Sequence, residues 1–236
     1  MLLHSIGILF TDPILFILLS LTFLATGGVA LLVAITVHEF SHAFVAHNLG
    51  DITPKYLGRL SLNPIRHLDP LGTVMIFAVG FGWGKPVPVN PLYLRNGPRA
   101  GMSVVAAAGP VSNIITAVVF SIPIRIGLLP WQSPALQVGF DGLEGLMADL
   151  VGWIVFFNII LAVFNLIPLF PLDGSKIAIG ILPTTIADKL SRLESLGPVV
   201  LLLLIMIDSI AGLNILWGVL RPLANVVGLL VVGNSI

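Results

Sequence analysis

The chain has 236 residues, of which 57% are hydrophobic and 9% are charged, and its mean hydropathy is +1.07. A soluble domain carries about 25% charged residues, so this composition excludes a soluble globular protein and indicates an integral membrane protein. The 11 basic and 11 acidic residues balance, which argues against nucleic acid as a partner, and the absence of cysteine excludes disulfides and thiolate metal sites.

Residues 5–48 form an apolar block that is interrupted at positions 12–13 and 26–28. A membrane span needs about 20 residues, so the block is long enough for two helices, near 5–25 and 28–48, with Gly27-Gly28 as the turn. One long kinked helix that starts at Pro13 is the alternative, and both remain open. No Lys or Arg precedes Lys55, so we expect no cleaved signal peptide and a first helix that stays in place.

The region from Asp51 to Arg99 is rich in Pro, Gly, Asn and basic residues, and it holds six of the 11 Lys and Arg residues. By the positive-inside rule this region faces the cytoplasm. Within it, residues 71–81 are apolar but only about half the length of a span, so we expect a re-entrant or interfacial segment there. The alternating prolines that follow Lys85 predict extended backbone at residues 85–90, as an edge strand or a loop.

Two further spans are expected within 101–129 and 150–169. The residues between them, 130–149, include three acidic residues and no basic one, which suits the non-cytoplasmic side. The basic residues that follow indicate that the chain then returns to the cytoplasm, and they are Lys176, Lys189 and Arg192. Residues 197–217 make another span, and 218–233 make a short last span or a surface helix.

The fold class expected from this pattern is an all-α integral membrane protein. We predict a bundle of five to six transmembrane helices, with a re-entrant or interfacial, Pro- and Gly-rich extended segment between the second and third spans. No long repeat or low-complexity tract divides the chain, so residues 1–236 are treated as a single domain, with a core at about 30–195 and C-terminal helices in 197–236.

Three titratable residues, His38, Glu39 and His42, end an apolar stretch in which residues 13–37 contain no Asp, Glu, Lys, Arg or His. A charged side chain deep in such a helix costs about 2.5–3.5 kcal/mol on insertion scales, so three together need an explanation. Residues four apart on a helix lie about 40° apart on one face, which lets both imidazoles turn toward one metal ion. Glu39 can then act as a general base toward water, as in a His-Glu-x-x-His metalloprotease. The alternative is a helix end that has reached the lipid headgroups.

A third ligand is needed, because a catalytic zinc ion takes three protein ligands and leaves its fourth position open. Most of the remaining His, Asp and Glu residues lie in the polar cytoplasmic region, on the far side, or inside a late apolar helix. Asp173 ends an apolar helix on the cytoplasmic side, at the depth of His38 and His42, provided that residues 71–81 do not span. Two prolines break the backbone before it, and irregular backbone at membrane depth is tolerated where it lines a cavity. We therefore predict one Zn²⁺ per chain, with a cytoplasmic helix cap as the alternative role of Asp173.

Four further residues are candidates for binding or orienting the substrate. Asn113 and Asn165 lie in apolar spans, where an amide usually bonds a neighbouring helix. We favour this packing role for Asn113, whereas Asn165 is expected to hold the substrate carbonyl or to orient a ligand. Val87 and Val89 are expected to pair with an unwound substrate helix as an added strand, with a structural interfacial loop as the alternative.

Five motifs occur along the chain, at His38–His42, Gly58–Pro64, Gly84–Pro91, Ala107–Asn113 and Asn165–Gly174. In this order they closely resemble the site-2 protease family of intramembrane zinc metalloproteases, over roughly residues 30–195. The resemblance implies that His38, His42 and Asp173 bind zinc, that Glu39 is the catalytic base, and that Asn165 lies close to the site. Residue 166 is Leu where many members carry Pro, and the likeness is to short members without PDZ-like or nucleotide-sensing domains.

The function favoured by these observations is an intramembrane zinc endopeptidase that hydrolyses peptide bonds of membrane-embedded substrate helices. Such a protein would be multi-pass in the cell membrane, surrounded by the lipid bilayer, with its active site toward the cytoplasmic side. A membrane metal transporter that uses the same His and Asp residues is the main alternative, although it needs no Glu beside the first His. A non-catalytic scaffold is a third.

Overall fold

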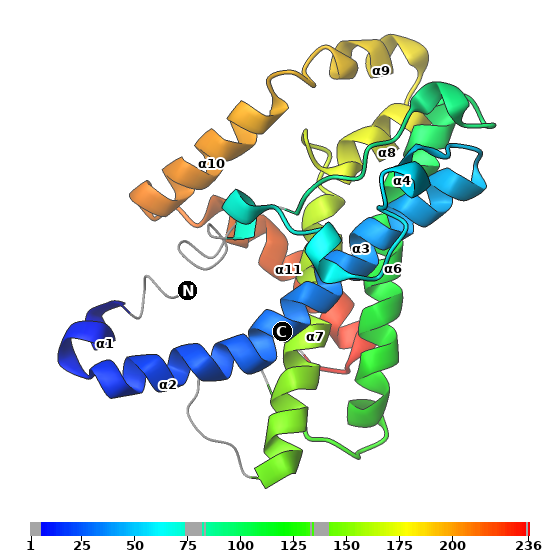
Figure 1. Cartoon of the computed structure of the whole chain (residues 1–236). Helices are drawn as coiled ribbons and strands as arrows, with labels where there is room; N and C mark the ends of the chain where they lie inside the picture. The colour runs from blue at the N-terminus through cyan, green and yellow to red at the C-terminus, as the bar shows by residue number, and fades with distance from the viewer. Residues whose placement is uncertain (1–5, 74–81, 83, 133, 135–141, 235) are drawn as a thin grey trace.

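The structure is a computed structural model of the whole chain, and it describes all residues except 1–5, 74–81, 83, 133, 135–141 and 235 (Figure 1). Helices dominate the described part of the chain, and its β structure is limited to an isolated antiparallel bridge between Leu68 and Gly84. The predicted all-α membrane fold is therefore confirmed. Most of the segment expected to be re-entrant, residues 71–81, lies outside the described residues.

The first apolar block forms one continuous helical run after α1 (Ile6–Thr11), because α2 (Pro13–Phe23), the π-helical turn η1 (Leu24–Gly28) and α3 (Val29–Asn48) follow without a break. Asp12 caps its start by accepting a hydrogen bond from the Leu15 N–H at 3.0 Å. At Gly27 the Phe23 ring occupies the space of a side chain, since a Cβ there would lie 2.4 Å from the ring. The single-helix alternative is thus right, and the turn at Gly27-Gly28 is wrong.

Two other helices are long and apolar enough to cross a membrane, α6 (Pro98–Arg125) and α7 (Gly142–Asn165), in addition to the run Pro13–Asn48. The apolar helices α10 (Gly197–Ala211) and α11 (Ile215–Val231) have 15 and 17 residues. At about 1.5 Å per residue neither reaches the roughly 30 Å of a hydrocarbon core. The remaining helical elements are short: α4 (Thr53–Tyr56), η2 (Pro64–Arg66), η3 (Pro91–Tyr93), α8 (Asp173–Ile181) and α9 (Thr184–Ser191).

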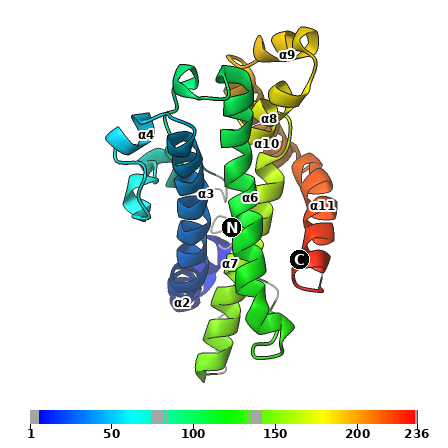
Figure 2. The ribbon, with the colours of Figure 1, turned by 90° about the vertical axis from the view of Figure 1, so that its right-hand side faces the viewer.

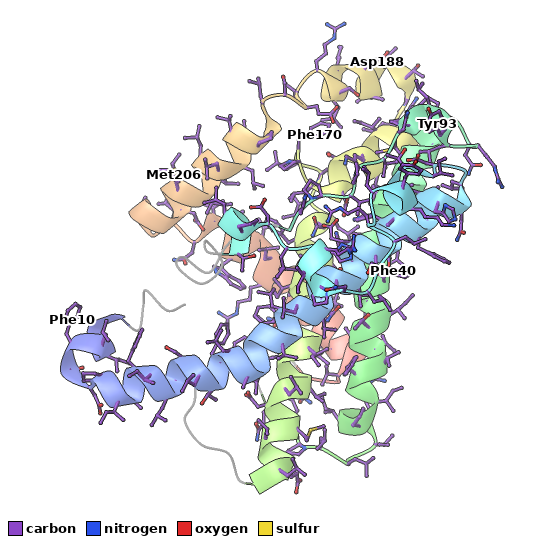
Figure 3. The ribbon with its side chains drawn as sticks, in the orientation of Figure 1. Phe10, Phe40, Tyr93, Phe170, Asp188 and Met206 are labelled. Carbon is purple, nitrogen blue, oxygen red and sulfur yellow. The ribbon has the colours of Figure 1, made fainter. Side chains whose placement is uncertain are left out.

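The centre of the molecule is the packing of α3, α6 and α7, which lie side by side in Figure 2. Alanines on the facing surfaces, including Ala34, Ala117 and Ala162, are fully buried and let the helix backbones approach closely. The helix α8 packs on α6, and α11 packs on α7 and α6. In contrast, α1, α2 and α10 extend away from this centre and expose apolar side chains, such as Phe10 on α1 and Met206 on α10 (Figure 3).

Two buried charged residues anchor the segment Lys85–Asn90, which forms neither helix nor strand. Arg59 donates to Lys85 O at 2.6 Å and to Pro86 O at 2.7 Å. At the other end, Asp51 Oδ2 accepts a hydrogen bond from Asn90 N at 2.7 Å. Of the two predicted forms, edge strand or loop, the structure shows a loop, and this segment, called the extended segment below, is tied to the end of α3 on one side and to the loop after α4 on the other.

Candidate metal centre

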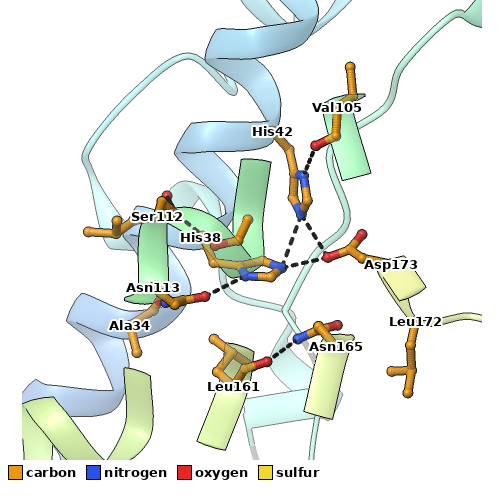
Figure 4. A network of polar contacts seen from close by, with 12 residues as sticks. Ala34, His38, His42, Val105, Ser112, Asn113, Leu161, Asn165, Leu172 and Asp173 are labelled. Atoms are coloured by element: carbon orange, nitrogen blue, oxygen red, sulfur yellow. Dashed lines mark hydrogen bonds and ion pairs between the residues drawn. The ribbon is translucent and has the colours of Figure 1, made fainter. Parts of the chain in front are cut away.

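His38 and His42 lie one turn apart on α3, and both imidazoles are buried. Their Nε2 atoms are 3.0 Å apart. Asp173, the first residue of α8, places its Oδ2 atom 3.2 Å from each of these nitrogens (Figure 4). The structure thus brings together the three side chains that the sequence proposes as ligands, from a spanning helix and from a short helix 131 positions further along the chain.

Hydrogen bonds on the far side of each ring determine which nitrogen carries the proton. His42 Nδ1 lies 2.7 Å from Val105 O, and a carbonyl oxygen can only accept, so Nδ1 must be the protonated atom. His38 Nδ1 lies 2.6 Å from Asn113 Oδ1, which also accepts. In the neutral imidazole each ring therefore has its lone pair on Nε2, and both Nε2 atoms face the same point.

The donor set fits a zinc ion. Two nitrogen lone pairs and a carboxylate oxygen converge, and Asp173 Oδ2 is buried and accepts no hydrogen bond. Such a cluster is unfavourable unless a cation lies among the three atoms. Tetrahedral zinc with bonds of about 2.0–2.2 Å separates its ligand atoms by about 3.3–3.6 Å, and the observed separations of 3.0 and 3.2 Å are within a few tenths of this.

Gly109 on α6 forms one wall of the centre. A Cβ atom at this position would lie 2.5 Å from His38 Cε1 and 2.5 Å from His42 Nε2, closer than side-chain atoms approach one another. The imidazoles therefore occupy the space that a larger residue would take. The adjacent Pro110 is also buried within the helix.

The chain between α7 and α8 folds back sharply, which places Asp173 at the centre. Gly174 packs directly on this turn, since a Cβ there would lie 2.3 Å from Leu166 O and 2.4 Å from Ile167 O. Ser175 Oγ donates to Leu172 O at 2.7 Å and holds the start of α8. The Asp-Gly pair in the sequence therefore combines a ligand candidate with the one residue type that fits behind it.

Glu39, the proposed base, is half-buried on α3 next to the two histidines. Its Oε1 lies 3.6 Å from the position that a Gly84 Cβ would have, so the carboxylate faces the start of the extended segment. Burial lowers the pKa of the Arg59 guanidinium, and the negative charge of Glu39 acts in the opposite direction. The Arg59 guanidinium, which bonds the extended segment, therefore interacts electrostatically with the Glu39 carboxylate. The catalytic role of Glu39 stays a prediction.

The other sequence candidates have different positions. Asn165 Nδ2 donates to Leu161 O at 2.9 Å, within its own helix. Val87 is half-buried, and Val89 packs against a cluster formed by Ala46, Leu94 and Val105. Val89 therefore supports the fold of the extended segment, and the roles of Asn165, Val87 and Val89 toward a substrate stay predictions.

Asn113 does more than pack. Its oxygen bonds His38, while its Nδ2 donates to Ala34 O at 3.0 Å and to Asn158 Oδ1 at 2.8 Å. Asn158, which the sequence reasoning missed, is fully buried on α7. The sequence signal that could have identified Asn158 is that it is a second amide in the apolar span, two helical turns before Asn165.

Comparison with known proteins identifies related sequences. The profile of peptidase family M50 matches residues 141–207. YwhC of Bacillus subtilis (strain 168), which carries the name of a zinc metalloprotease, is 38% identical over 195 residues, covering 82% of this chain and 84% of YwhC. Rip2 of Mycolicibacterium smegmatis carries the same description and is 31% identical over 150 residues, covering 61% of this chain and 52% of Rip2. Rip2 of Mycobacterium tuberculosis is 30% identical over 149 residues with the same coverage. No solved structure matches the chain.

The likeness to YwhC extends over most of both proteins, so it applies to the chain as a whole and not to a shared segment. It removes the transporter and scaffold alternatives, and the cluster of His38, His42 and Asp173 agrees with a zinc cofactor. The chain is a membrane protein of the site-2 protease family, peptidase family M50, and it is a zinc metalloprotease.

Proposed function

We propose that this enzyme is an intramembrane endopeptidase that hydrolyses peptide bonds of membrane-embedded substrate helices. The observation that carries the proposal is the position of the donor cluster, because His38 and His42 belong to the helical run Pro13–Asn48, which is long and apolar enough to span a membrane. A hydrolytic centre on such a helix meets peptide bonds at the same depth. The substrate is accordingly a transmembrane protein or peptide.

In this proposal His38, His42 and Asp173 hold one zinc ion per chain, and Glu39 is the general base. Zinc supplies Lewis acidity, which polarises a carbonyl and makes water a nucleophile at neutral pH. Glu39 accepts the proton of the attacking water and delivers it to the leaving amine, so that one C–N bond breaks as one C–O bond forms. Asn165, at the end of α7, orients the substrate near this point.

The extended segment is proposed to receive the substrate as an added strand. Arg59 and Asp51 fix its two ends, as their hydrogen bonds to Lys85, Pro86 and Asn90 support. Between these anchors, and within the described part of the chain, the Val87 and Val89 N–H groups are not bonded to backbone carbonyls. Unpaired donors of this kind are what strand addition uses, and an unwound helix brings matching carbonyls.

The proposed orientation places the zinc centre toward the cytoplasm. In Figure 1 the short elements α4, α8 and α9 gather at one end of the bundle, and the turn of residues 126–132 that follows α6 lies at the other. All Lys and Arg residues except Arg125 and Arg221 fall in or beside those short elements and the segments that join them. The positive-inside rule then supports a multi-pass protein of the cell membrane with this end in the cytoplasm.

The experiment that tests the catalytic assignment replaces Glu39 with Gln in the full chain. Glu39→Gln keeps the size of the side chain and removes its basicity, so zinc content is expected to stay at one equivalent while hydrolysis of membrane proteins is abolished. Glu144→Gln, at the exposed start of α7, is the control and is expected to act like wild type. Proteomic comparison of membranes that contain each variant provides the measurement, and retained proteolysis by Glu39→Gln refutes the assignment.

A further inference from the structure

A chain of buried amides runs from the metal centre into the packed interface of three helices. His38 on α3 bonds Asn113 on α6, Asn113 bonds Asn158 on α7, and Asn158 Nδ2 donates to Ile154 O at 2.8 Å. Both asparagines are 0% exposed. Figure 4 shows the hydrogen bond between His38 and Asn113, at the edge of the His38 ring that points away from Asp173.

Two backbone carbonyls set the direction of every hydrogen bond in this chain. Ile154 O can only accept, so the amide nitrogen of Asn158 must face it, and the Asn158 oxygen faces Asn113. Ala34 O likewise requires the amide nitrogen of Asn113, which turns the Asn113 oxygen toward His38. His38 must then carry its proton on Nδ1. The tautomer of the ring is thus determined by peptide groups of α3 and α7 through two side-chain amides.

We propose that Asn113 and Asn158 are a positioning pair for zinc binding, in which Asn113 fixes the tautomer and the plane of the His38 ring and Asn158 fixes the orientation of Asn113. The inference rests on the proposed role of His38 as a zinc ligand. His42 needs no such device, because its Nδ1 bonds the backbone carbonyl of Val105 directly. Groups that hold the second nitrogen of a ligating histidine typically contribute 10–100-fold in metal affinity.

The competing interpretation is that both amides only join helices, as buried amides in membrane bundles commonly do. The two interpretations differ in what Asn113→Asp does. A carboxylate still accepts the hydrogen bond from His38 Nδ1. Its second oxygen, however, replaces the amide nitrogen that donates to Ala34 O and Asn158 Oδ1, so both of these hydrogen bonds are lost. A positioning role therefore survives this substitution, while a packing role is damaged by it more than by an apolar residue.

The test measures the affinity for Zn²⁺, by competition with a chelator, and the absorption spectrum of the Co²⁺-loaded full chain in detergent. Asn113→Leu is expected to weaken zinc binding by about 10–100-fold and to change the Co²⁺ spectrum. Asn113→Asp is expected to recover most of the affinity, and Asn158→Leu to lose less than Asn113→Leu. Asn225→Leu removes an amide on α11 whose oxygen accepts a hydrogen bond from Ile236 N, and as the control it is expected to bind zinc like wild type.

Wild-type affinity and an unchanged Co²⁺ spectrum in Asn113→Leu overturn the proposal, as does an Asn113→Asp variant that binds zinc no better than Asn113→Leu. If Asn113→Leu does not fold, the zinc affinity and the Co²⁺ spectrum of Asn158→Leu and Asn113→Asp test the proposal instead. The ligand assignment is tested separately by His38→Ala and Asp173→Ala. Full zinc binding in those two variants refutes the proposed ligand set, whatever the asparagine variants do.

Discussion

Gly109 gives the two histidines the space in which they meet, and this makes it as specific to the centre as the ligand candidates themselves. In Gly109→Ala the new Cβ would lie 2.5 Å from both rings, so the imidazoles must move apart or α6 must withdraw. Overpacking of this kind costs about 1–3 kcal/mol, which corresponds to about a 5–150-fold loss of zinc affinity. Zinc titration of the purified variant provides the measurement.

Gly218→Ala is the matched control for this substitution. Gly218 lies on α11, and a Cβ there meets nothing within 4 Å, so this variant is expected to bind zinc like wild type. Equal zinc affinity of Gly109→Ala and Gly218→Ala would show that the rings do not depend on the space at Gly109.

For single residues, the sequence identified those whose chemical signal is local, and it missed a residue whose partner is distant in the chain. His38, Glu39 and His42 stand out because charged groups are costly in an apolar helix. Asp173 could be matched to them only because the distribution of basic residues indicates sidedness. Asn158 is marked in the sequence only as an amide in an apolar span, which does not identify its partner Asn113, 45 positions away.

The element whose function most needs a test is the extended segment Lys85–Asn90. Val87 lies between its two anchors, so Val87→Asp puts a charge where a substrate strand is proposed to pair, and cleavage is expected to fall at least tenfold with zinc content unchanged. Leu92→Asp is the control, because Leu92 is 81% exposed just beyond the anchor at Asn90. Cleavage and zinc are measured on the same reconstituted samples, and unchanged turnover in Val87→Asp contradicts the pairing.

Helix lengths and connections were only partly predictable. A Gly-Gly pair is compatible with a turn, but it also gives room for a ring, and the contact of Phe23 with Gly27 and of Phe23 with Trp153 on α7 keeps the helix continuous. That contact joins residues 130 positions apart, so no local pattern reveals it. The turn before Asp173 was predicted in outline from its prolines, whereas the packing of Gly174 on two carbonyls depends on the folded chain.

For the whole molecule, the metal is expected to act as a cross-link between the spanning helix α3 and the short helix α8. A ligand that binds only the folded state adds stability, by about 2.7 kcal/mol when it is present at 100 times its dissociation constant. Removal of zinc with a chelator is therefore expected to lower the midpoint of thermal unfolding of the wild type. Asp173→Ala, which lacks the cross-link, is expected to unfold at the same temperature with and without chelator. Equal midpoints for zinc-loaded and zinc-free wild type would contradict a structural contribution of the metal.

The most direct measurement is the position of the cut in a transmembrane substrate. Wild-type protein, loaded with zinc and reconstituted in a lipid bilayer with a single-span model protein, is incubated and the products are mapped by mass spectrometry. An intramembrane endopeptidase is expected to produce new termini inside the apolar span, and these termini are absent with Glu39→Gln. Termini found only in segments outside the span, from a sample that holds one zinc per chain, would contradict intramembrane cleavage.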